Sequence, residues 1–245
     1  MTTTRPTDVA AVLHGLVRDP GRPRVTWYGP DHERVELSGA VLVNWVVKTT
    51  NLLVEELDVQ PGTRVLLDLP AHWRALTWAT AAWRAGACVV RAERSGAPQD
   101  GHAVDVVVTD RPDAHSGTVV AVTLAALARS WPGTLPRGAV DAAAAVMTYP
   151  DALGWLPPAD PQAPAVAGGA DVVPHAGLTA AALADAPSAG ARVLRDARGD
   201  DAVGLALAAL GTWAVGGSLV LVDGAALDDA ALARVRETER VTAAD

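Results

Sequence analysis

The sequence predicts an α/β fold in which two similar βαβ-containing halves carry mostly parallel sheets flanked by helices. One observation is that apolar segments of the β type alternate with Ala/Leu-rich segments along the 245 residues. A second is that several apolar segments are continuous Val/Leu runs, which is typical of strands covered on both faces. The third is an internal repeat: residues 64–68 are matched at 192–196, and residues 83–90 at 213–220. Each copy reads as strand, helix, glycine-ended turn and strand, which is a βαβ unit.

Eight segments have the composition of strands. In chain order they are Arg24–Tyr28, Arg34–Leu37, Val65–Leu69, Cys88–Val90, Val104–Thr109, Val119–Thr123, Val193–Leu194 and Leu219–Val222. Helices are expected between them, and two have clear starts, because Thr7 and Ser38 are residue types that cap helices. The remaining helices are expected at 71–85, at 202–215 and, with an amphipathic pattern, at 227–239.

The segment at 134–164 differs from its surroundings because it is rich in Ala, Pro and Gly. We therefore expect a first α/β half at 1–133, a connecting segment at 134–164 and a second half at 165–245. The alternative is that the two halves form one compact domain.

Composition excludes several classes of protein. Half of the residues are hydrophobic and the net charge is −8, which argues against a disordered chain and against a protein that follows nucleic-acid phosphates. Cys88 is the single cysteine, so neither a disulfide framework nor a cysteine zinc site is expected. The N-terminus carries no apolar signal segment. These features predict a cytoplasmic protein.

One segment, Ala202–Val222, has no charged residue and is long enough to span a bilayer. Glycines at 211, 216 and 217 interrupt it, and it is one copy of the repeat. A buried helix, a glycine turn and a buried strand are therefore expected rather than a membrane span.

The segment Ala165–Asp171 stands where a phosphate-binding loop would lie, between an expected strand and an expected helix. It lacks the glycine spacing, the hydroxyl residues and the lysine of such loops, so a plain turn is favoured. In addition, no Lys or Arg occurs from Gly138 to Ala191, although five aspartates do. Phosphoryl and adenylyl transfer need cations on the phosphates, which only an arginine from elsewhere in the chain could supply here.

Other chemical signals are weak. The histidines form no metal-binding spacing, and the pairs Asp200-Asp201 and Asp228-Asp229 are typical of helix N-termini rather than of magnesium sites. The run at 113–116 contains the residue types of a catalytic triad, but adjacency in sequence is not triad geometry. Cys88 lies in an expected strand and is interpreted as a core residue. Three tryptophans of one expected helix, at 73, 78 and 83, indicate packing on several sides.

Four short sequences, taken together, carry a family resemblance. They are PGTRV at 61–65, WRAGACVV at 83–90, HAGL at 175–178 and ERVT at 239–242. In this order they resemble the motifs of adenylate-forming (AMP-binding) enzymes, such as acyl-CoA synthetases, adenylation domains of peptide synthetases and luciferase. The resemblance implies the first two α/β halves of the large N-terminal domain of those enzymes. The Arg- and Ala-rich composition resembles that of a short actinobacterial group of relatives.

The departures from this family bear on activity. Its lysine-containing phosphate loop would fall between Ala165 and His175, where this chain is shorter and has no lysine. The segment at 195–204 lacks the aromatic-His motif, and the chain ends before the Tyr-Gly-x-Thr-Glu motif, the ribose-binding aspartate and the C-terminal lysine domain of the family. Lys48, the only lysine, lies within an expected helix of the first half. No catalytic residue is therefore carried over.

We expect a truncated, catalytically degenerate homologue, a pseudoenzyme that acts by binding a protein or a small ligand. The alternatives are a nucleotide or acyl-adenylate binder, a ligase completed by a partner chain, and an unrelated small-molecule binder at the C-terminal edge of the sheet. If active, it would be an adenylate-forming ligase.

The candidate binding residues are Gly168, Gly169 and His175, in a vestigial phosphate-loop region. No catalytic residue, metal ligand or cofactor is expected; ATP or AMP would be the exception. The missing third subdomain predicts self-association or a protein partner near the C-terminal helix, whereas nucleic-acid binding is not expected.

Overall fold

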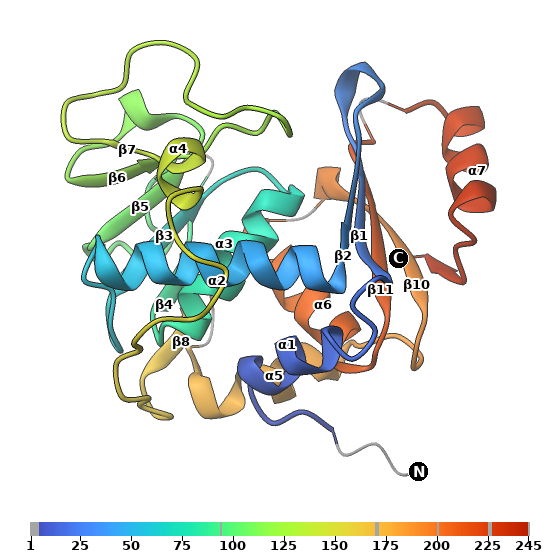
Figure 1. Cartoon of the computed structure of the whole chain (residues 1–245), viewed down its shortest axis with the longest axis horizontal. Coiled ribbons are helices and arrows are strands. Elements are labelled where there is room, and N and C mark those ends of the chain that lie inside the picture. Colours follow the sequence, from blue (N-terminus) through green and yellow to red (C-terminus); the bar gives the residue numbers. More distant parts are fainter. Residues whose placement is uncertain (1–4, 94, 170–171, 200, 225–226, 245) are drawn as a thin grey trace.

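Two β-sheets form the framework of the computed structural model, which describes residues 5–93, 95–169, 172–199, 201–224 and 227–244 (Figure 1). The first sheet has seven strands in the order β7-β6-β5-β3-β4-β8-β9, and the second has five in the order β12-β10-β11-β1-β2. All neighbours in both sheets are parallel except β8–β9 and β1–β2. The predicted fold class, with mostly parallel sheets, is confirmed.

The strands of the first sheet are β3 (Arg64–Asp68), β4 (Cys88–Arg91), β5 (Val106–Thr109), β6 (Thr118–Ala121), β7 (Val140–Asp141), β8 (Pro164–Ala167) and β9 (Val173–Pro174). Those of the second are β1 (Pro23–Tyr28), β2 (Arg34–Ser38), β10 (Arg192–Asp196), β11 (Ser218–Val222) and β12 (Ala243–Ala244). All eight predicted strands are present. Strands β7, β8, β9 and β12 are not among the eight predicted; β7, β9 and β12 have only two residues each, and so short a segment carries no pattern.

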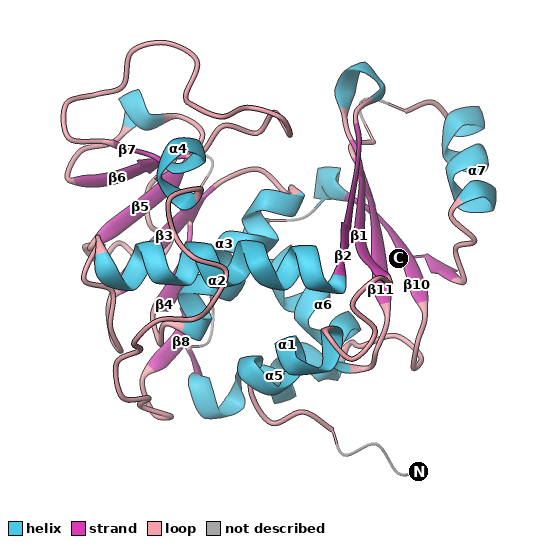
Figure 2. Ribbon diagram, viewed as in Figure 1, coloured by secondary structure: helices cyan, strands magenta, loops and turns pink. Residues whose placement is uncertain are grey.

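The helices are α1 (Val9–Leu16), α2 (Gly39–Glu55), α3 (Trp73–Arg84), α4 (Ala142–Val146), α5 (His175–Ala184), α6 (Ala202–Ala214) and α7 (Asp229–Thr238). Helices α2, α3 and α6 lie between the two sheets, and α7 lies on the outer face of the five-stranded sheet (Figure 2). Helix α6 contacts β3 and β4 of one sheet and β11 of the other. The main core is therefore shared by both sheets.

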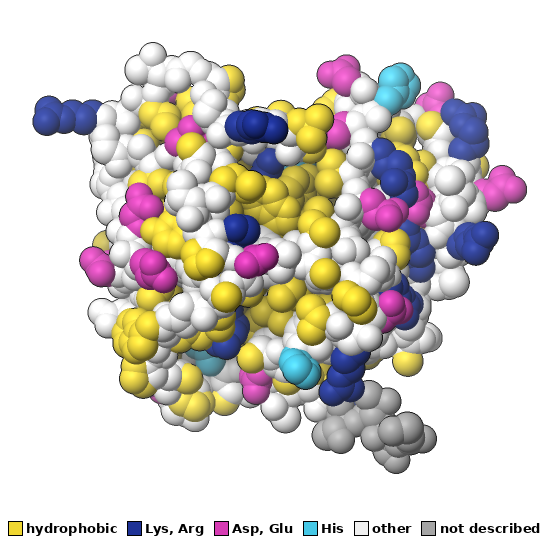
Figure 3. Space-filling view, in the orientation of Figure 1, with side chains coloured by type: hydrophobic (Ala, Val, Ile, Leu, Met, Phe, Trp, Pro, Cys, Tyr) yellow, Lys and Arg dark blue, Asp and Glu magenta, His cyan; other side chains and the backbone are white. Residues whose placement is uncertain are grey.

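A hollow separates the two sheets above α2 in the space-filling view, and apolar side chains cover its floor (Figure 3). The three tryptophans of α3, Trp73, Trp78 and Trp83, are all buried, as predicted for a helix packed on several sides. Cys88 is also buried, and burial raises the pKa of its thiol to about 11, so it is a core residue.

The internal repeat corresponds to two βαβ units. Strand β3 pairs in parallel with β4 and β10 with β11, and in each case the first residues align, Arg64 with Cys88 and Arg192 with Ser218. Helices α3 and α6 join these strands and pack against each other. After each helix the turn contains a glycine with positive φ, 87° at Gly86 and 76° at Gly216. This repeat could be predicted from the sequence because its strand, helix and turn patterns each depend on residues close together in the chain.

The order of the strands in the two sheets does not follow their order along the chain. Strands β1 and β2 belong to the second sheet, where Val25 aligns with Leu219. Strand β8 belongs to the first, where Val166 aligns with Val89. The reason is that backbone pairing sets strand order, and strand composition does not specify the partner.

Helix starts follow the predicted chemistry with one correction. Ser38 caps α2 by accepting a hydrogen bond from the Val41 N–H at 3.4 Å. Helix α1 is capped by Asp8 rather than by Thr7: the Asp8 carboxylate accepts from the Ala11 N–H at 2.8 Å. Asp228 likewise caps α7. A carboxylate at this position also interacts favourably with the helix dipole.

The segment Ala202–Val222 folds as α6, a glycine turn and β11, as expected. Among the described residues, none of the helices combines the length and the apolar composition needed to cross a bilayer.

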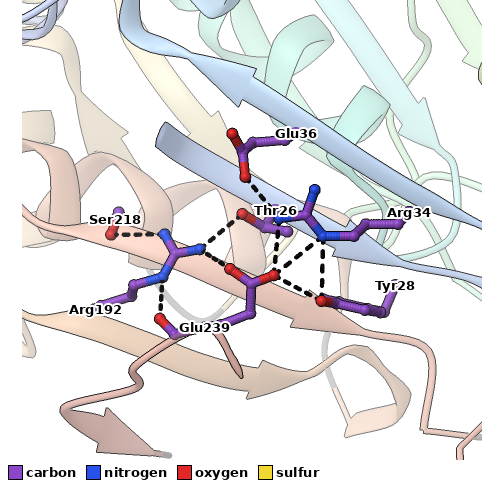
Figure 4. Close-up of polar contacts among 7 residues, drawn as sticks. All are labelled: Thr26, Tyr28, Arg34, Glu36, Arg192, Ser218 and Glu239. Carbon is purple, nitrogen blue, oxygen red and sulfur yellow. Dashed lines mark hydrogen bonds and ion pairs between the residues drawn. The ribbon is translucent and has the colours of Figure 1, made fainter. Parts of the chain in front are cut away.

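The ERVT sequence anchors the C-terminal helix to the second sheet through Glu239 (Figure 4). Its Oε1 accepts hydrogen bonds from the Tyr28 hydroxyl at 2.6 Å and from Arg34 Nη2 at 2.8 Å. Its Oε2 is bound by Arg192, whose Nη2 also donates to the Thr26 hydroxyl at 2.9 Å. One carboxylate thus links side chains of β1, β2 and β10.

Candidate functional site

A cleft of about 520 Å³ opens at the carboxyl ends of β3, β4 and β5, where open α/β sheets hold ligands. The beginning of α6 forms part of its wall, so the strand–helix junctions of both repeats meet here. Its lining residues are Leu67, Asp68, Leu69, Pro70, Ala71, Ala92, Glu93, Gln99, Asp110, Arg111, Arg198, Asp201 and Ala202.

Asp68, the last residue of β3, is buried, and three polar side chains on one side of the cleft contact its carboxylate. Its carboxylate accepts hydrogen bonds from Thr109 Oγ1 at 2.9 Å and from Arg111 Nη2 at 2.7 Å. His115 Nε2 lies 2.7 Å from its Oδ2. Burial would raise the pKa of Asp68, but the hydrogen bonds from His115, Arg111 and Thr109 outweigh it and hold the pKa below its ordinary value. Asp68 is therefore ionised and neutralises Arg111.

His115 was visible in the sequence only as part of the run at 113–116. In the structure its ring pairs with Asp68 at the end of β3, which lies outside that run. Sequence reasoning missed Asp68 as a site residue, although it ends a predicted strand of a parallel sheet, and that position is a usable signal.

Gly168 and Gly169 follow β8 and lie against Arg91, the last residue of the adjacent strand β4. Gly168 has φ 86°, and a Cβ there would lie 3.0 Å from the backbone N of Arg91. A Cβ on Gly169 would lie 3.6 Å from Arg91 Nε. Strand pairing thus brings an arginine from outside the cation-free window to Gly168 and Gly169, where the sequence predicts a vestigial phosphate loop.

The guanidinium of Arg91 is already engaged, because Nη1 contacts both carboxylate oxygens of Asp201. Asp201 is also the N-cap of α6: its Oδ1 accepts from the N–H groups of Val203 at 3.0 Å and Gly204 at 2.9 Å. A helix N-terminus is a ready anion site. Here a carboxylate of the chain itself occupies it and neutralises the arginine beside it.

Arg198 is the third arginine in or beside the cleft among the described residues. It forms an ion pair with Asp196 at 2.6 Å. Glu93 and Asp110 add further carboxyl groups to the lining. Burial raises the pKa of Asp110, and the nearby carboxylate of Asp68 adds to this effect. In the described part of the chain, the three arginines in or beside the cleft are therefore each matched by an aspartate, and Glu93 and Asp110 lie beside them.

His175 lies at the other end of the β8–β9 hairpin from Gly168, because Pro164 aligns with Pro174. Its Nε2 lies 3.1 Å from the Ala87 carbonyl, and burial lowers the pKa of its ring. It lines a separate groove of about 440 Å³. The structure thus does not bring the three predicted binding residues together.

Lys48 and the acidic pairs have structural contacts. The Lys48 ammonium donates to the Tyr149 carbonyl, away from the cleft. Asp200 lies outside the described residues, whereas Asp201 and Asp228 are helix caps. In the ranges that the structure describes, no group of three or more His, Cys, Asp and Glu side chains could hold a metal ion.

Comparison with known proteins gives one similar sequence and several similar folds. A protein of Mycobacterium tuberculosis (strain ATCC 25618 / H37Rv), named "TIGR03089 family protein", is 36% identical over 251 residues, covering 98% of both chains. No family model matches the sequence.

The similar solved structures are larger proteins. An acyl-CoA synthetase of Brucella canis matches 97% of this chain with a TM-score of 0.71 and 20% identity. An amide bond synthetase of Marinactinospora thermotolerans matches 96% with a TM-score of 0.65 and 19% identity. An artificially fused adenylation–PCP di-domain from Klebsiella oxytoca matches 98% with a TM-score of 0.70 and 14% identity. This chain spans 50%, 48% and 43% of their respective lengths.

Proposed function

The chain belongs to the TIGR03089 protein family and has the fold of the N-terminal part of adenylate-forming enzymes, and from this premise we propose that it is a catalytically degenerate homologue that acts by binding. The observation that carries the proposal is the pairing of the cleft arginines. Arg91, Arg111 and Arg198 are held by Asp201, Asp68 and Asp196, respectively. Among the described residues, a triphosphate entering this cleft would meet arginines that carboxylates already hold, together with the further carboxyl groups of Glu93 and Asp110.

The chemistry of adenylate-forming enzymes also needs groups that stabilise the negative charge on the phosphoryl oxygens and on the departing pyrophosphate. Arg91 ends β4, the neighbour of β8 in the sheet, and lies against Gly168 and Gly169; its guanidinium already has a carboxylate partner. Releasing it would cost the ion pair and leave the Asp201 carboxylate at the helix N-terminus facing the incoming anion. This arrangement supports loss of adenylation rather than its retention.

ATP–pyrophosphate exchange by the purified protein tests this proposal. With a panel of aliphatic and aromatic carboxylic acids and Mg²⁺, we expect no exchange above the protein-free rate. Calorimetry with ATP and with AMP is expected to show no heat of binding. Exchange with any acid would overturn the proposal and favour an active ligase.

A single substitution should restore part of the anion site. Asparagine caps helices as well as aspartate does, so Asp201→Asn keeps the cap of α6 but removes the charge that neutralises Arg91. We expect pyrophosphate to bind this variant at least about tenfold more tightly than the wild type, since one charge-assisted contact is worth about 1.5–3 kcal/mol.

Asp228→Asn is the matched control, because it makes the same change at the N-cap of α7. It should leave pyrophosphate binding at the wild-type level. Equal binding by all three proteins would show that Asp201 does not block the site.

The expected partner surface near the C-terminal helix stays a prediction. The large apolar side chains that are exposed among the described residues are Val17, Val41, Leu127, Met147, Leu153, Trp155 and Val172. All of them lie outside α7.

A further inference from the structure

A second groove, of about 970 Å³, lies at the amino ends of the parallel strands of the five-stranded sheet, whereas the cleft lies at carboxyl ends. Its lining includes residues that come just before three parallel strands: Arg22 before β1, Gly190 before β10 and Gly216 before β11. The cleft residues Arg198 and Asp201 instead follow the carboxyl end of β10. The two sites are therefore separated by the length of the strands.

Four arginines line this groove: Arg5, Arg18, Arg22 and Arg24. Within the described part of the chain, none of them forms an ion pair with a carboxylate. In a protein with net charge −8, four unneutralised cations in one groove are a marked local excess of positive charge.

Arg24 is the least exposed of the four, with 4% of its surface accessible. Its Nη1 donates to the carbonyls of Gly216 at 2.9 Å and Gly217 at 3.2 Å, but its Nε is buried and has no hydrogen-bond partner. Arg22 donates to the Gly190 carbonyl at 3.1 Å. Burial and the charge of Arg22 lower the pKa of Arg24, and Asp19 opposes this without forming an ion pair. A buried cation without a counter-ion is costly, and a bound anion would relieve that cost.

The surface between the arginines is apolar. The half-buried residues Pro187, Ala214 and Val215 contribute to it, whereas Val12, Leu16 and Trp213, which also line the groove, are almost fully buried. A ligand that fits must therefore combine apolar groups with negative charges.

We propose that this groove binds an acidic, partly apolar segment of a partner polypeptide, which would place its carboxylates on the arginines and its apolar side chains on the floor. The inference rests on the proposed function as a binding protein. An extended chain fits better than a single small anion, because the guanidiniums come from four separate positions, and the volume is at the upper limit of small-molecule sites. Arginine clusters are a recurrent means of recognising acidic segments.

Fluorescence anisotropy with a labelled twelve-residue peptide of alternating glutamate and leucine tests the proposal. The wild-type protein is expected to bind it, and to bind a glutamine–leucine peptide of the same length at least tenfold more weakly. The double variant Arg18→Glu/Arg22→Glu should bind the acidic peptide at least tenfold more weakly than the wild type. Both side chains retain surface exposure, so the variant should fold, and its thermal melting temperature checks this.

Arg137→Glu makes the same kind of charge change at an exposed arginine outside the groove and should bind within twofold of the wild type. Equal binding by the groove variant and the wild type would overturn the proposal. The proposal would also be overturned if citrate or pyrophosphate displaced the peptide at a concentration equal to the dissociation constant of the peptide, because that would indicate a site for small anions. If the peptide does not bind and no ATP–pyrophosphate exchange occurs, the groove proposal is wrong and the loss of adenylation still holds. If exchange occurs and the peptide binds as expected, only the proposed loss of adenylation is wrong.

Discussion

Replacing Glu239 with alanine is expected to lower the free energy of unfolding by about 3–5 kcal/mol, the cost of removing one partner from a buried ion pair. The Glu239 side chain is 6% exposed and binds Arg34 and Arg192. Its removal would leave the guanidinium of Arg192, a side chain that is 16% exposed, without its carboxylate partner. The Tyr28 hydroxyl would lose its acceptor as well. Urea unfolding at pH 7 measures the loss.

Two control variants separate the contributions. Glu237→Ala changes an exposed residue of the same helix and should stay within about 0.5 kcal/mol of the wild type. Glu239→Gln keeps the size and one acceptor but not the charge, and should fall between the wild type and the alanine variant. If Glu239→Ala were as stable as Glu237→Ala, the contacts of Glu239 would contribute no net stability.

The same carboxylate makes stability depend on pH. Burial alone would raise the pKa of Glu239, but the hydrogen bonds from Tyr28, Arg34 and Arg192 hold it below the ordinary value of 4.5. The unfolded chain therefore takes up a proton before the folded protein does, so this stability is complete above pH 4.5 and is lost as the pH falls through the folded-state pKa. The difference in unfolding free energy between the wild type and Glu239→Gln should accordingly shrink in acid.

Gly211→Ala is the second substitution with a large expected effect. A Cβ at this position in α6 would lie 1.9 Å from the carbonyl oxygen of Ala182 and 2.9 Å from its carbonyl carbon. Helices α5 and α6 pack closely here, and backbone atoms cannot move aside as a flexible side chain would. Overpacking typically costs about 1–3 kcal/mol, and we expect a loss at or above the upper end. Thermal unfolding followed by circular dichroism measures it.

Gly15→Ala provides the comparison, because a Cβ at Gly15 of α1 would meet nothing within 4 Å. Alanine is a better helix former than glycine by about 0.8–1.0 kcal/mol, so this variant should be as stable as the wild type or slightly more stable. A Gly211→Ala variant that unfolds at the same temperature as Gly15→Ala would show that α5 and α6 can separate at little cost.

Much of the fold could be predicted from the sequence because its signals are local. The Val/Leu runs of β3 and β11, the glycine-ended turns at Gly86 and Gly216 and the cap at Ser38 depend on residues a few positions apart. The repeat doubled these signals, so the segment Ala202–Val222 could be assigned to a helix and a strand despite its apolar composition.

The site was only partly predictable. The sequence showed that the segment Ala165–Asp171, where a phosphate loop is expected, has no local cation. It did not show that Arg91 lies against two glycines of this segment or that Asp201, 110 residues further along the chain, neutralises it. The pairing of His115 with Asp68 was hidden for the same reason.

The sequence by itself therefore determined the α/β class, the two βαβ units and the absence of lysine near the expected phosphate loop. Only the tertiary structure decided which strands share a sheet and which arginines meet which aspartates. The physical reason is that hydrophobic periodicity and capping act over one or two turns, whereas ion pairs follow from strand order. Strand order in turn depends on pairing between distant segments, such as β1 with β11 and β4 with β8.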